Sequence, residues 1–233
     1  MGTLFFLKLN NMKTYIGIDF SINSPALTLY LNDEFHFFSF FNFDPNRFLD
    51  KKFPKAITVH RMLHDSHNAT LIPYLRKKTA EDYSEDQFNK IKDADNLATL
   101  ITKTLISNVP KPDNLDIAIE GYSYGSKGNA IIDIVSFNSV LRNYLYRIFP
   151  AAKIWIFSPS AIKKFAGKGN AKKSDMLDYF LAEPPKHKFS QFVAENKEML
   201  VNSTDVKKPV DDIIDSYFIC KYLMHRVIHD ALR

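Results

Sequence analysis

The run TYIGIDF at residues 14–20 predicts a first β-strand. It has the length of a strand, is rich in strand-forming residues and brings an acidic side chain, Asp19, to the strand end. Two more strand-like runs follow at residues 26–31 and 34–41, with the turn signal Asn32-Asp33 between them. Three strands joined by short connections predict an antiparallel meander.

Beyond the meander, the chain alternates between helical and strand patterns. Continuous apolar runs predict strands at residues 115–119 and 153–157, and residues 56–78 look partly helical. Helical spacing or a helix start signal marks the following further segments: 86–108, 129–149, the region after Ser158-Pro159, the region after Ser174, 191–200 weakly, and 208–231. This alternation predicts an α/β fold, in which a mixed sheet combines the antiparallel meander with parallel strands and carries helices on both faces.

The composition is that of an ordinary globular chain with a mild excess of positive charge. The 233 residues are 45% hydrophobic and 24% charged, and 31 Lys and Arg against 26 Asp and Glu give a formal net charge of +5. This length suits one enlarged domain or two small ones. It is cramped for the two large domains of an actin-like ATPase, and seven glycines without a P-loop pattern argue against a glycine-rich phosphate-binding protein.

The sequence shows no credible targeting signal. The apolar patch at residues 4–7 is far shorter than the ~20 residues that a membrane span needs. We therefore interpret residues 1–13 as an N-terminal tail and expect no membrane partner. The single cysteine, Cys220, excludes an intramolecular disulfide and a cysteine-based zinc cluster. This cysteine usage fits a reducing, intracellular location, in the cytoplasm or with the nucleoid.

Four carboxylates lie where a chain that only builds a core does not need them. Asp19 ends the first strand, and Glu120 ends the strand at residues 115–119. Asp212 and Asp215 lie three residues apart at the start of the last helix, on the face that its apolar stripe continues. Together these positions would gather four negative charges that raise one another's pKa. A hard divalent cation relieves this repulsion, and carboxylate oxygens are the ligands that Mg²⁺ prefers.

Each of these carboxylates also has a purely structural interpretation. Acidic residues at strand ends are often solvated, and an aspartate near a helix start complements the helix dipole. The metal interpretation depends on all four carboxylates occurring in a compatible order of strands and helix.

Four blocks of the sequence resemble the RuvC family of Holliday-junction resolvases, within the RNase H-like superfamily. IGIDFS at residues 16–21 resembles the first-strand motif of the family, and AIE at residues 118–120 looks like its second acidic strand end. GKGNAKKS at residues 167–174 is similar to its glycine-containing basic loop, and DIIDS at residues 212–216 is similar to its paired-aspartate helix. The blocks come in family order. The resemblance implies one RNase H-like nuclease domain over residues 14–233, with insertions at about 42–86 and 184–207.

The sequence departs from the family pattern at several points. The resemblance does not explain the two insertions, and Ser21 and Ile22 stand where the family often has a glycine-containing turn. Tyr217 and Phe218 follow the paired aspartates, where small residues are usual. These differences indicate a divergent branch, with a viral protein in the host cytoplasm as one interpretation. They affect the expected junction selectivity more than the expected catalysis.

The resemblance implies a Mg²⁺-dependent endodeoxyribonuclease that resolves Holliday junctions by paired symmetric nicks through two-metal phosphodiester hydrolysis. Two Mg²⁺ ions per active site, for which Mn²⁺ would substitute, would share Asp19. Glu120 would hold one ion, and Asp212 with Asp215 would hold the other. The implied partners are branched DNA, in particular a four-way junction, and a second copy of the chain, because two symmetric nicks need two active sites.

Basic residues are concentrated between residues 153 and 188. Eight lysines against three acidic residues give this segment an excess of +5, equal to that of the whole chain. Such a patch supplies the salt-sensitive part of DNA affinity, although a solvated helix face is the alternative. The candidate DNA-binding lysines are Lys163, Lys164, Lys168 and Lys172. Lys173 is placed with the catalytic residues, because by resemblance Lys163 and Lys173 match lysines that contact phosphate or assist catalysis.

Aromatic and histidine side chains give two weaker signals. Tyr122 and Tyr124 follow the second acidic strand end, where the family has an aromatic residue that wedges into the junction centre. Stacking on a DNA base and plain packing explain these tyrosines about equally well. His60, His64 and His67 would share one face if this segment were helical, with a spacing that could bind zinc. No fourth ligand type is obvious nearby, and a partly exposed polar face is the simpler interpretation.

Two alternatives to junction resolution stay open. The same site could cut flaps, forks and other branched DNA with relaxed specificity, or the chain could bind DNA structures with an inactive site. Metal-dependent nicking of a mobile four-way junction distinguishes these functions best.

Overall fold

The computed structural model of the protein describes residues 13–43, 58–63, 69–77, 79–122, 129–184, 187–202 and 205–232. Within them the strands are β1 (Thr14–Asp19), β2 (Ala26–Leu31), β3 (Glu34–Asn42), β4 (Thr70–Tyr74), β5 (Leu115–Glu120), β6 (Lys153–Phe157), β7 (Val201–Asn202) and β8 (Asp205–Val206). The helices are α3 (Tyr83–Asn108), α4 (Asn129–Ile148), α5 (Pro159–Ala166), α6 (Lys173–Ala182), α7 (Lys188–Glu195), α8 (Lys197–Leu200) and α9 (Val210–Ala231), besides helical residues 58–63 and a 3₁₀ turn at Pro112–Asn114. Of the expected tail at residues 1–13, only Lys13 is among the described residues, and its ammonium pairs with Asp116 at 2.6 Å.

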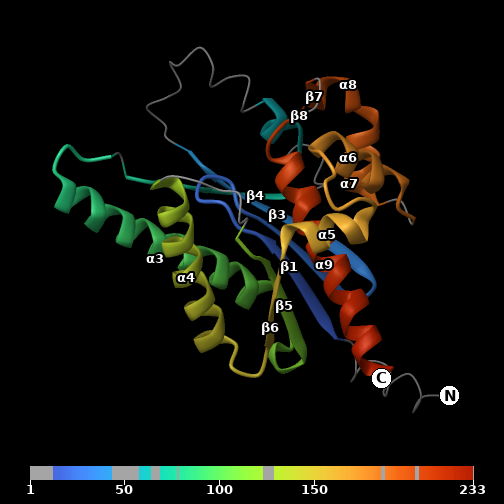
Figure 1. The fold of residues 1–233 in the computed structure, drawn as a ribbon, viewed down its shortest axis with the longest axis horizontal. Helices are drawn as coiled ribbons and strands as arrows, with labels where there is room; N and C mark the ends of the chain where they lie inside the picture. Colours follow the sequence, from blue (N-terminus) through green and yellow to red (C-terminus); the bar gives the residue numbers. More distant parts are fainter. Residues whose placement is uncertain are drawn as a thin grey trace.

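The central sheet has six strands in the order β4-β3-β2-β1-β5-β6 (Figure 1). β1, β2 and β3 pair antiparallel, whereas β5 runs parallel to β1, and β6 runs parallel to β5. Asn32 and Asp33 make the tight β2–β3 turn with φ values of 54° and 65°, a left-handed conformation that Asn and Asp tolerate better than most residues. The predicted mixed sheet, an antiparallel meander joined to parallel strands, is confirmed.

The edge strand β4 is not predicted by the sequence pattern. Among the described residues of the segment 56–78, which was predicted to be partly helical, residues 58–63 are helical, whereas residues 70–74 pair in parallel with β3. Pro73 lies inside this strand, and a proline without a backbone N–H is tolerated in an edge strand. A five-residue strand that contains a proline has too short a pattern to be recognised by periodicity.

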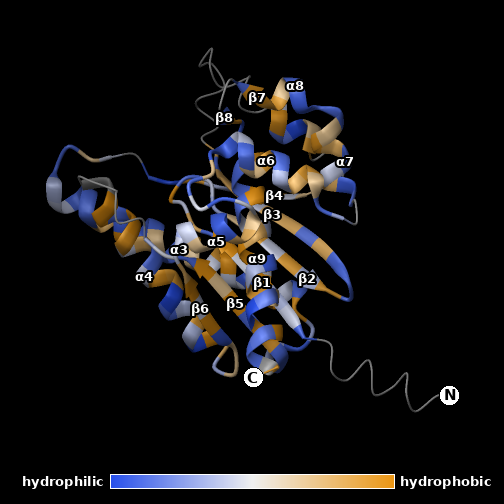
Figure 2. Ribbon diagram, turned by 45° about the vertical axis from the view of Figure 1, so that its right-hand side comes forward, coloured by the Kyte–Doolittle hydropathy of each residue, from blue (hydrophilic) through white to orange (hydrophobic). Residues whose placement is uncertain are grey.

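Helices cover both faces of the sheet (Figure 1). α3 and α4 pack on one face, where Leu97 and Leu141 are buried with Ile16 of β1. α9 crosses the other face together with α5 and α6, and its residue Ile213 is buried in the same cluster as Ala118 of β5. The ribbon coloured by hydropathy shows many hydrophobic residues along the strands that these helices cover (Figure 2). Among the described helices, none combines the length and the apolarity that crossing a membrane requires.

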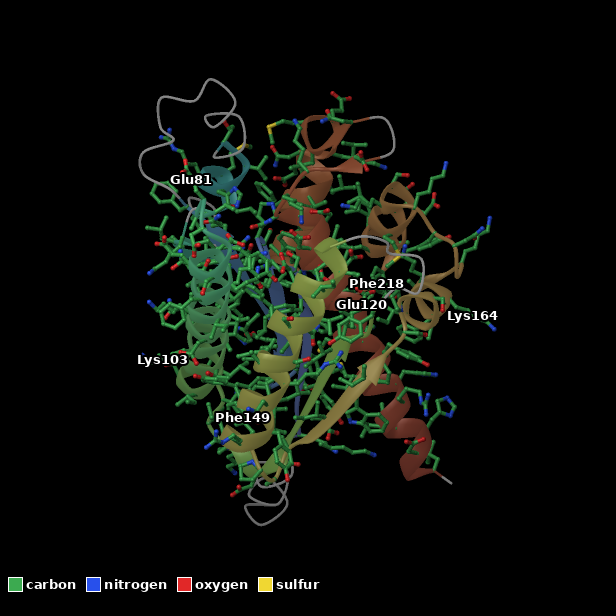
Figure 3. The ribbon with its side chains drawn as sticks, turned by 60° about the vertical axis from the view of Figure 1, so that its left-hand side comes forward. Glu81, Lys103, Glu120, Phe149, Lys164 and Phe218 are labelled. Atoms are coloured by element: carbon green, nitrogen blue, oxygen red, sulfur yellow. The ribbon has the colours of Figure 1, made fainter. Side chains whose placement is uncertain are left out.

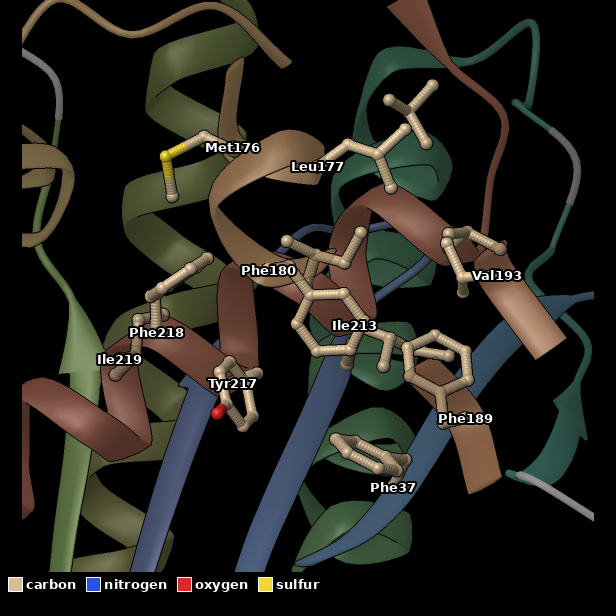
Figure 4. Packing of buried hydrophobic residues seen from close by; sticks show 14 of the residues in the cluster. Phe37, Met176, Leu177, Phe180, Phe189, Val193, Ile213, Tyr217, Phe218 and Ile219 are labelled. Carbon is tan, nitrogen blue, oxygen red and sulfur yellow. The ribbon is translucent and has the colours of Figure 1, made fainter. Parts of the chain in front are cut away.

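The segment at 184–207, expected as an insertion, contributes α7, α8 and the short β7–β8 hairpin. Its apolar residues Phe189 and Val193 are buried in the same cluster as Phe180 of α6 and Tyr217 of α9 (Figure 4). The rings of Phe37 and Phe189 lie 4.8 Å apart, centroid to centroid. The bulky Tyr217, which departs from the family pattern, therefore packs against aromatic side chains: its ring centroid lies 5.0 Å from that of Phe180.

Sheet and helix approach each other very closely at Gly17 of β1. A Cβ atom at this residue would lie 2.3 Å from both the backbone oxygen of Ser216 and the backbone nitrogen of Cys220. Real Cβ atoms do not come this close to backbone atoms, so only glycine lets α9 lie directly on β1. Because α9 carries Asp212 and Asp215, this close packing also sets the distance between those residues and the end of β1.

Substitution Gly17→Ala tests this packing. We expect the added methyl group to push α9 off β1 and to lower the free energy of unfolding by at least about 2 kcal/mol, in the range measured for overpacked cores. Thermal or urea denaturation measures the change. Gly169→Ala is the control, because its Cβ would lie 3.5 Å from the nearest atom, an ordinary van der Waals distance. Equal stability of the two variants would contradict the close packing of α9 on β1.

Candidate functional site

Two acidic residues lie next to each other at one edge of the sheet, where β1 and β5 end. These strands are parallel, and their register pairs Ile18 with Ile119. The next residue on each strand is acidic, Asp19 on β1 and Glu120 on β5. Asp19 is only 8% exposed, and Glu120 is partly buried. The parallel pairing thus places the two predicted strand-end carboxylates at adjacent positions.

The first turns of α9 bring further carboxylates to the same edge. Asp211 and Asp212 are 4% and 5% exposed, and Asp215, one turn further along, is partly buried. The charges of Asp212 and Asp215 act on Asp19, and the charge of Glu120 acts on Asp215. The structure therefore brings the four predicted carboxylates together and adds a fifth, Asp211.

Burial and mutual repulsion raise the pKa values of these carboxyl groups. Burial is the largest cause at Asp19, and the charges of three neighbouring carboxylates raise its pKa further. Burial raises the pKa of Glu120 to about 7. Burial and then the charge of Glu120 raise the pKa of Asp215 to about 8. Loss of hydration thus raises these pKa values more than the repulsion between carboxylates that the sequence pattern predicted. The buried positions do not fit the interpretation of these residues as solvated strand-end acids.

A lysine and a serine hold the Asp212 carboxylate. The Lys208 ammonium donates hydrogen bonds to Oδ1 and Oδ2 of Asp212, at 2.6 and 2.8 Å. The Ser24 hydroxyl donates a third hydrogen bond to Oδ2, at 2.6 Å. Burial and the charge of Asp211 raise the pKa of Asp212, and Lys208 and Ser24 oppose the increase.

Two more lysines lie beside the cluster. The Lys173 ammonium at the start of α6 pairs with Asp211. Lys163 of α5 acts electrostatically on Glu120 and on Asp215, and lowers the pKa of both. Of the lysines predicted from the sequence, Lys163 and Lys173 are therefore the two that reach the carboxylates.

The donor set suits a hard divalent cation such as Mg²⁺ or Mn²⁺. All five acidic side chains offer carboxylate oxygens, and Oδ1 of Asp211 is buried without a hydrogen-bond partner among the described residues. Lysines now supply the opposing positive charge at Asp211 and Asp212. Within the described part of the chain, no three His, Cys, Asp or Glu side chains already stand as a metal-binding group. The chemistry of the donors fits the metal, but these lysine pairings would have to change for it to bind.

The remaining predicted DNA-binding lysines are exposed. Lys164, Lys168 and Lys172 are exposed on α5 and on the loop that joins it to α6. Figure 3 shows Lys164 projecting to the outside of the molecule, whereas Glu120, the last residue of β5, lies in the interior of the view. These side chains are available to a large anionic partner at the surface near the acidic site.

Tyr122 is held by the protein itself. Its ring lies 4.8 Å from the guanidinium carbon of Arg142, and its hydroxyl donates a long hydrogen bond of 3.4 Å to the backbone oxygen of Val135. The packing interpretation therefore accounts for Tyr122, and Tyr124 lies outside the described residues. His60 packs against the ring of Phe41, with centroids 4.7 Å apart.

The other two histidines of the zinc-like spacing, His64 and His67, lie outside the described residues. Three residues of the site were missed by the sequence argument: Asp211, Lys208 and Ser24. A local signal existed for the first two, because Lys208 and Asp212 have the i,i+4 spacing of a helical ion pair and Asp211 lies beside a predicted ligand. Ser24 had no such signal, since it lies 188 residues from its partner.

Comparisons with known proteins find similarity among solved structures only. No family model matches the sequence, and no curated protein matches it. Thermus thermophilus RuvC has a similar structure, with a TM-score of 0.48 and 9% sequence identity over 91% of this chain and 96% of that chain. T. thermophilus RuvC in complex with a Holliday junction substrate gives 0.48 and 6% over 92% and 96%. The yeast mitochondrial Holliday junction resolvase Ydc2 gives 0.46 and 13% over 90% and 76%.

The raised pKa values predict how stability depends on pH when no metal is bound. The folded protein keeps protons on Glu120 and Asp215 that the unfolded chain releases above its ordinary carboxyl pKa of about 4. The free energy of unfolding should therefore fall as the pH rises from about 4 to about 8. Thermal denaturation in a chelator at several pH values measures this slope.

Asp215→Asn separates this effect from other titrating groups. The variant should lose the part of the slope that extends towards pH 8, because its amide does not titrate. A variant with the same slope as the wild type would show that Asp215 is ionised normally in the folded protein.

Proposed function

We propose that the protein is a divalent-metal-dependent endodeoxyribonuclease that resolves four-way DNA junctions by paired nicks. The observation that carries this proposal is the cluster of Asp19, Glu120, Asp212 and Asp215, which three separate elements bring to one edge of the sheet. Their burial against one another costs folding stability. A site that needs several carboxylates for metal binding explains why the chain retains them.

The side chains of the cluster have distinct roles in this proposal. Asp19 lies at the centre and would contact both ions, Glu120 would hold one, and Asp212 with Asp215 would hold the other. When bound, two Mg²⁺ ions would supply the positive charge that polarises the scissile phosphate and stabilises the leaving 3′ oxygen. Burial of the carboxylates strengthens this electrostatic effect, because water screens charges less inside the protein.

Lysines at and around the site would position the DNA. Lys164, Lys168 and Lys172 are exposed next to the acidic edge and would bind backbone phosphates, which hold the duplex without reading its sequence. Lys163 acts electrostatically on Glu120 and Asp215, so it would contact the phosphates nearest to the site of cleavage. A homodimer with twofold symmetry would place two such sites on one junction for paired nicks.

Substitution of the carboxylates tests the catalytic proposal. Asp19→Asn and Glu120→Gln should each reduce Mg²⁺-dependent nicking of a mobile four-way junction by more than about 100-fold, because loss of a ligand costs more than loss of a residue that only orients one. Gel analysis of end-labelled junctions measures the rate. Asp178→Asn is the matched control, since Asp178 is an exposed aspartate paired with Lys197 away from the cluster.

Activity of both variants at the wild-type rate would overturn the proposed site. Wild-type protein that cuts flaps and three-way junctions as fast as four-way junctions would instead support the relaxed-specificity nuclease. Binding of junctions without cleavage in Mg²⁺ or Mn²⁺ would establish a DNA-binding protein with an inactive site.

The exposed lysines predict a salt-dependent binding surface. The double variant Lys164→Ala, Lys168→Ala should bind junction DNA more weakly and reduce the slope of log affinity against log salt by about 1 for each phosphate that is no longer neutralised. Lys103→Ala is the control, because Lys103 is exposed on α3 at the opposite side of the molecule (Figure 3). Fluorescence anisotropy at several salt concentrations measures both slopes. An unchanged slope in the double variant would place the DNA elsewhere.

A further inference from the structure

The Lys208 ammonium occupies the part of Asp212 that a metal ion would need. It donates to both carboxylate oxygens at once, at 2.6 and 2.8 Å, while Ser24 takes a further lone pair of Oδ2. A carboxylate has about four lone pairs for hydrogen bonds or metal ligands. With three of them used, Asp212 has little capacity left for an ion.

Lys208 and a divalent cation therefore exclude each other at Asp212. Two positive charges that share one carboxylate would lie a few ångströms apart in a partly buried site, where their repulsion is weakly screened. The lysine has the geometry of an internal counter-ion, which neutralises Asp212 without an ion from solution.

The two partners differ in their freedom to move. The Asp212 side chain is 6% exposed and is held by Ser24, whereas the Lys208 side chain is 51% exposed. Lys208 precedes α9 and can turn towards solvent without disturbing the helix. When the two separate, it is thus the lysine that leaves and the carboxylate that stays.

We propose that Lys208 is a positioning residue that holds the Asp212 carboxylate in the metal-free protein and is displaced when a divalent cation binds there. This inference rests on the proposed function, because it takes Asp212 as a metal ligand. Once displaced, the ammonium projects from the acidic edge at which the DNA is proposed to bind and can pair with a backbone phosphate. DNA then offers Lys208 a replacement partner, so that DNA and metal strengthen each other's binding.

Removal of the lysine charge tests the inference without any cleavage assay. Mg²⁺ and Mn²⁺ are titrated by calorimetry into DNA-free wild type, Lys208→Met, Lys208→Arg and Asp212→Asn. Lys208→Met should bind the ions about tenfold more tightly, a typical size for coupling between two binding events. Lys208→Arg keeps the charge and should bind like the wild type, whereas Asp212→Asn should bind more weakly. Lys197→Met is the matched control, because Lys197 is 49% exposed and pairs with Asp178 away from the cluster.

A second measurement uses stability. In chelator, Lys208→Met should unfold at a lower temperature than the wild type, because the buried Asp212 loses its counter-ion, and added Mg²⁺ should raise its unfolding temperature by more than it raises that of the wild type. Lys208→Gln keeps two N–H donors for Asp212 without the charge and serves if the methionine variant does not fold.

Metal affinity that is equal to or weaker than that of the wild type in both uncharged variants would overturn the inference. An absence of binding in every protein would also overturn it. Because these titrations contain no DNA, they remain interpretable if the wild type fails to cut any junction, a result that would overturn only the proposed nuclease.

The coupling between DNA and metal gives the last readout. A short duplex should raise the Mg²⁺ affinity of the wild type and should raise that of Lys208→Met by a smaller factor, since the variant has no ammonium to transfer to the phosphate. If the duplex raised the Mg²⁺ affinity of both proteins by the same factor, Lys208 would not couple DNA binding to metal binding.

Discussion

The close packing of α9 on Gly17 is the constraint on which the rest of the site depends. Because β1 presents no side chain at Gly17, the backbone of α9 lies directly on the sheet at Ser216 and Cys220. One turn before Ser216, the same helix carries Asp212, and its position follows from that packing. A bulkier residue at Gly17 would move the helix and separate its aspartates from the end of β1. The same contact between helix and sheet therefore packs the core and assembles the site.

The site stores electrostatic free energy that the fold has to offset. Desolvation and mutual repulsion oppose the ionised forms of Asp19, Glu120 and Asp215. Lys208 and Lys173 reduce part of this electrostatic cost, because they pair with aspartates at the start of α9. Two hydrophobic clusters, one on each face of the sheet, offset the rest of this free-energy cost, because burial of their side chains stabilises the folded protein.

Sequence patterns predict this fold well where they are long or repeated, and poorly where they are short. The strands of the meander and the long helices have clear periodicity. Asn32-Asp33 clearly marks the turn between the second and third strands of the meander. The pattern does not predict β4, because a strand of five residues that contains Pro73 is too short to show a periodicity. The carboxylates Asp19, Glu120, Asp212 and Asp215 stand out because acidic residues at strand ends and on an inward helix face are unusual. Ser24 does not stand out, because a serine in a loop is common.

Local pattern and residue type are enough to predict the α/β class, the order of the strands in the meander and the four acidic positions. Only the tertiary structure decided that Asp211 joins the cluster, that Lys208 and Ser24 hold Asp212 and that Tyr122 packs against Arg142. Apart from the i,i+4 pair of Lys208 and Asp212, these contacts join residues that are distant in the chain, and all of them depend on how strongly burial removes water. For residues distant in the chain, both the separation and the burial are set only when α9 packs on the sheet.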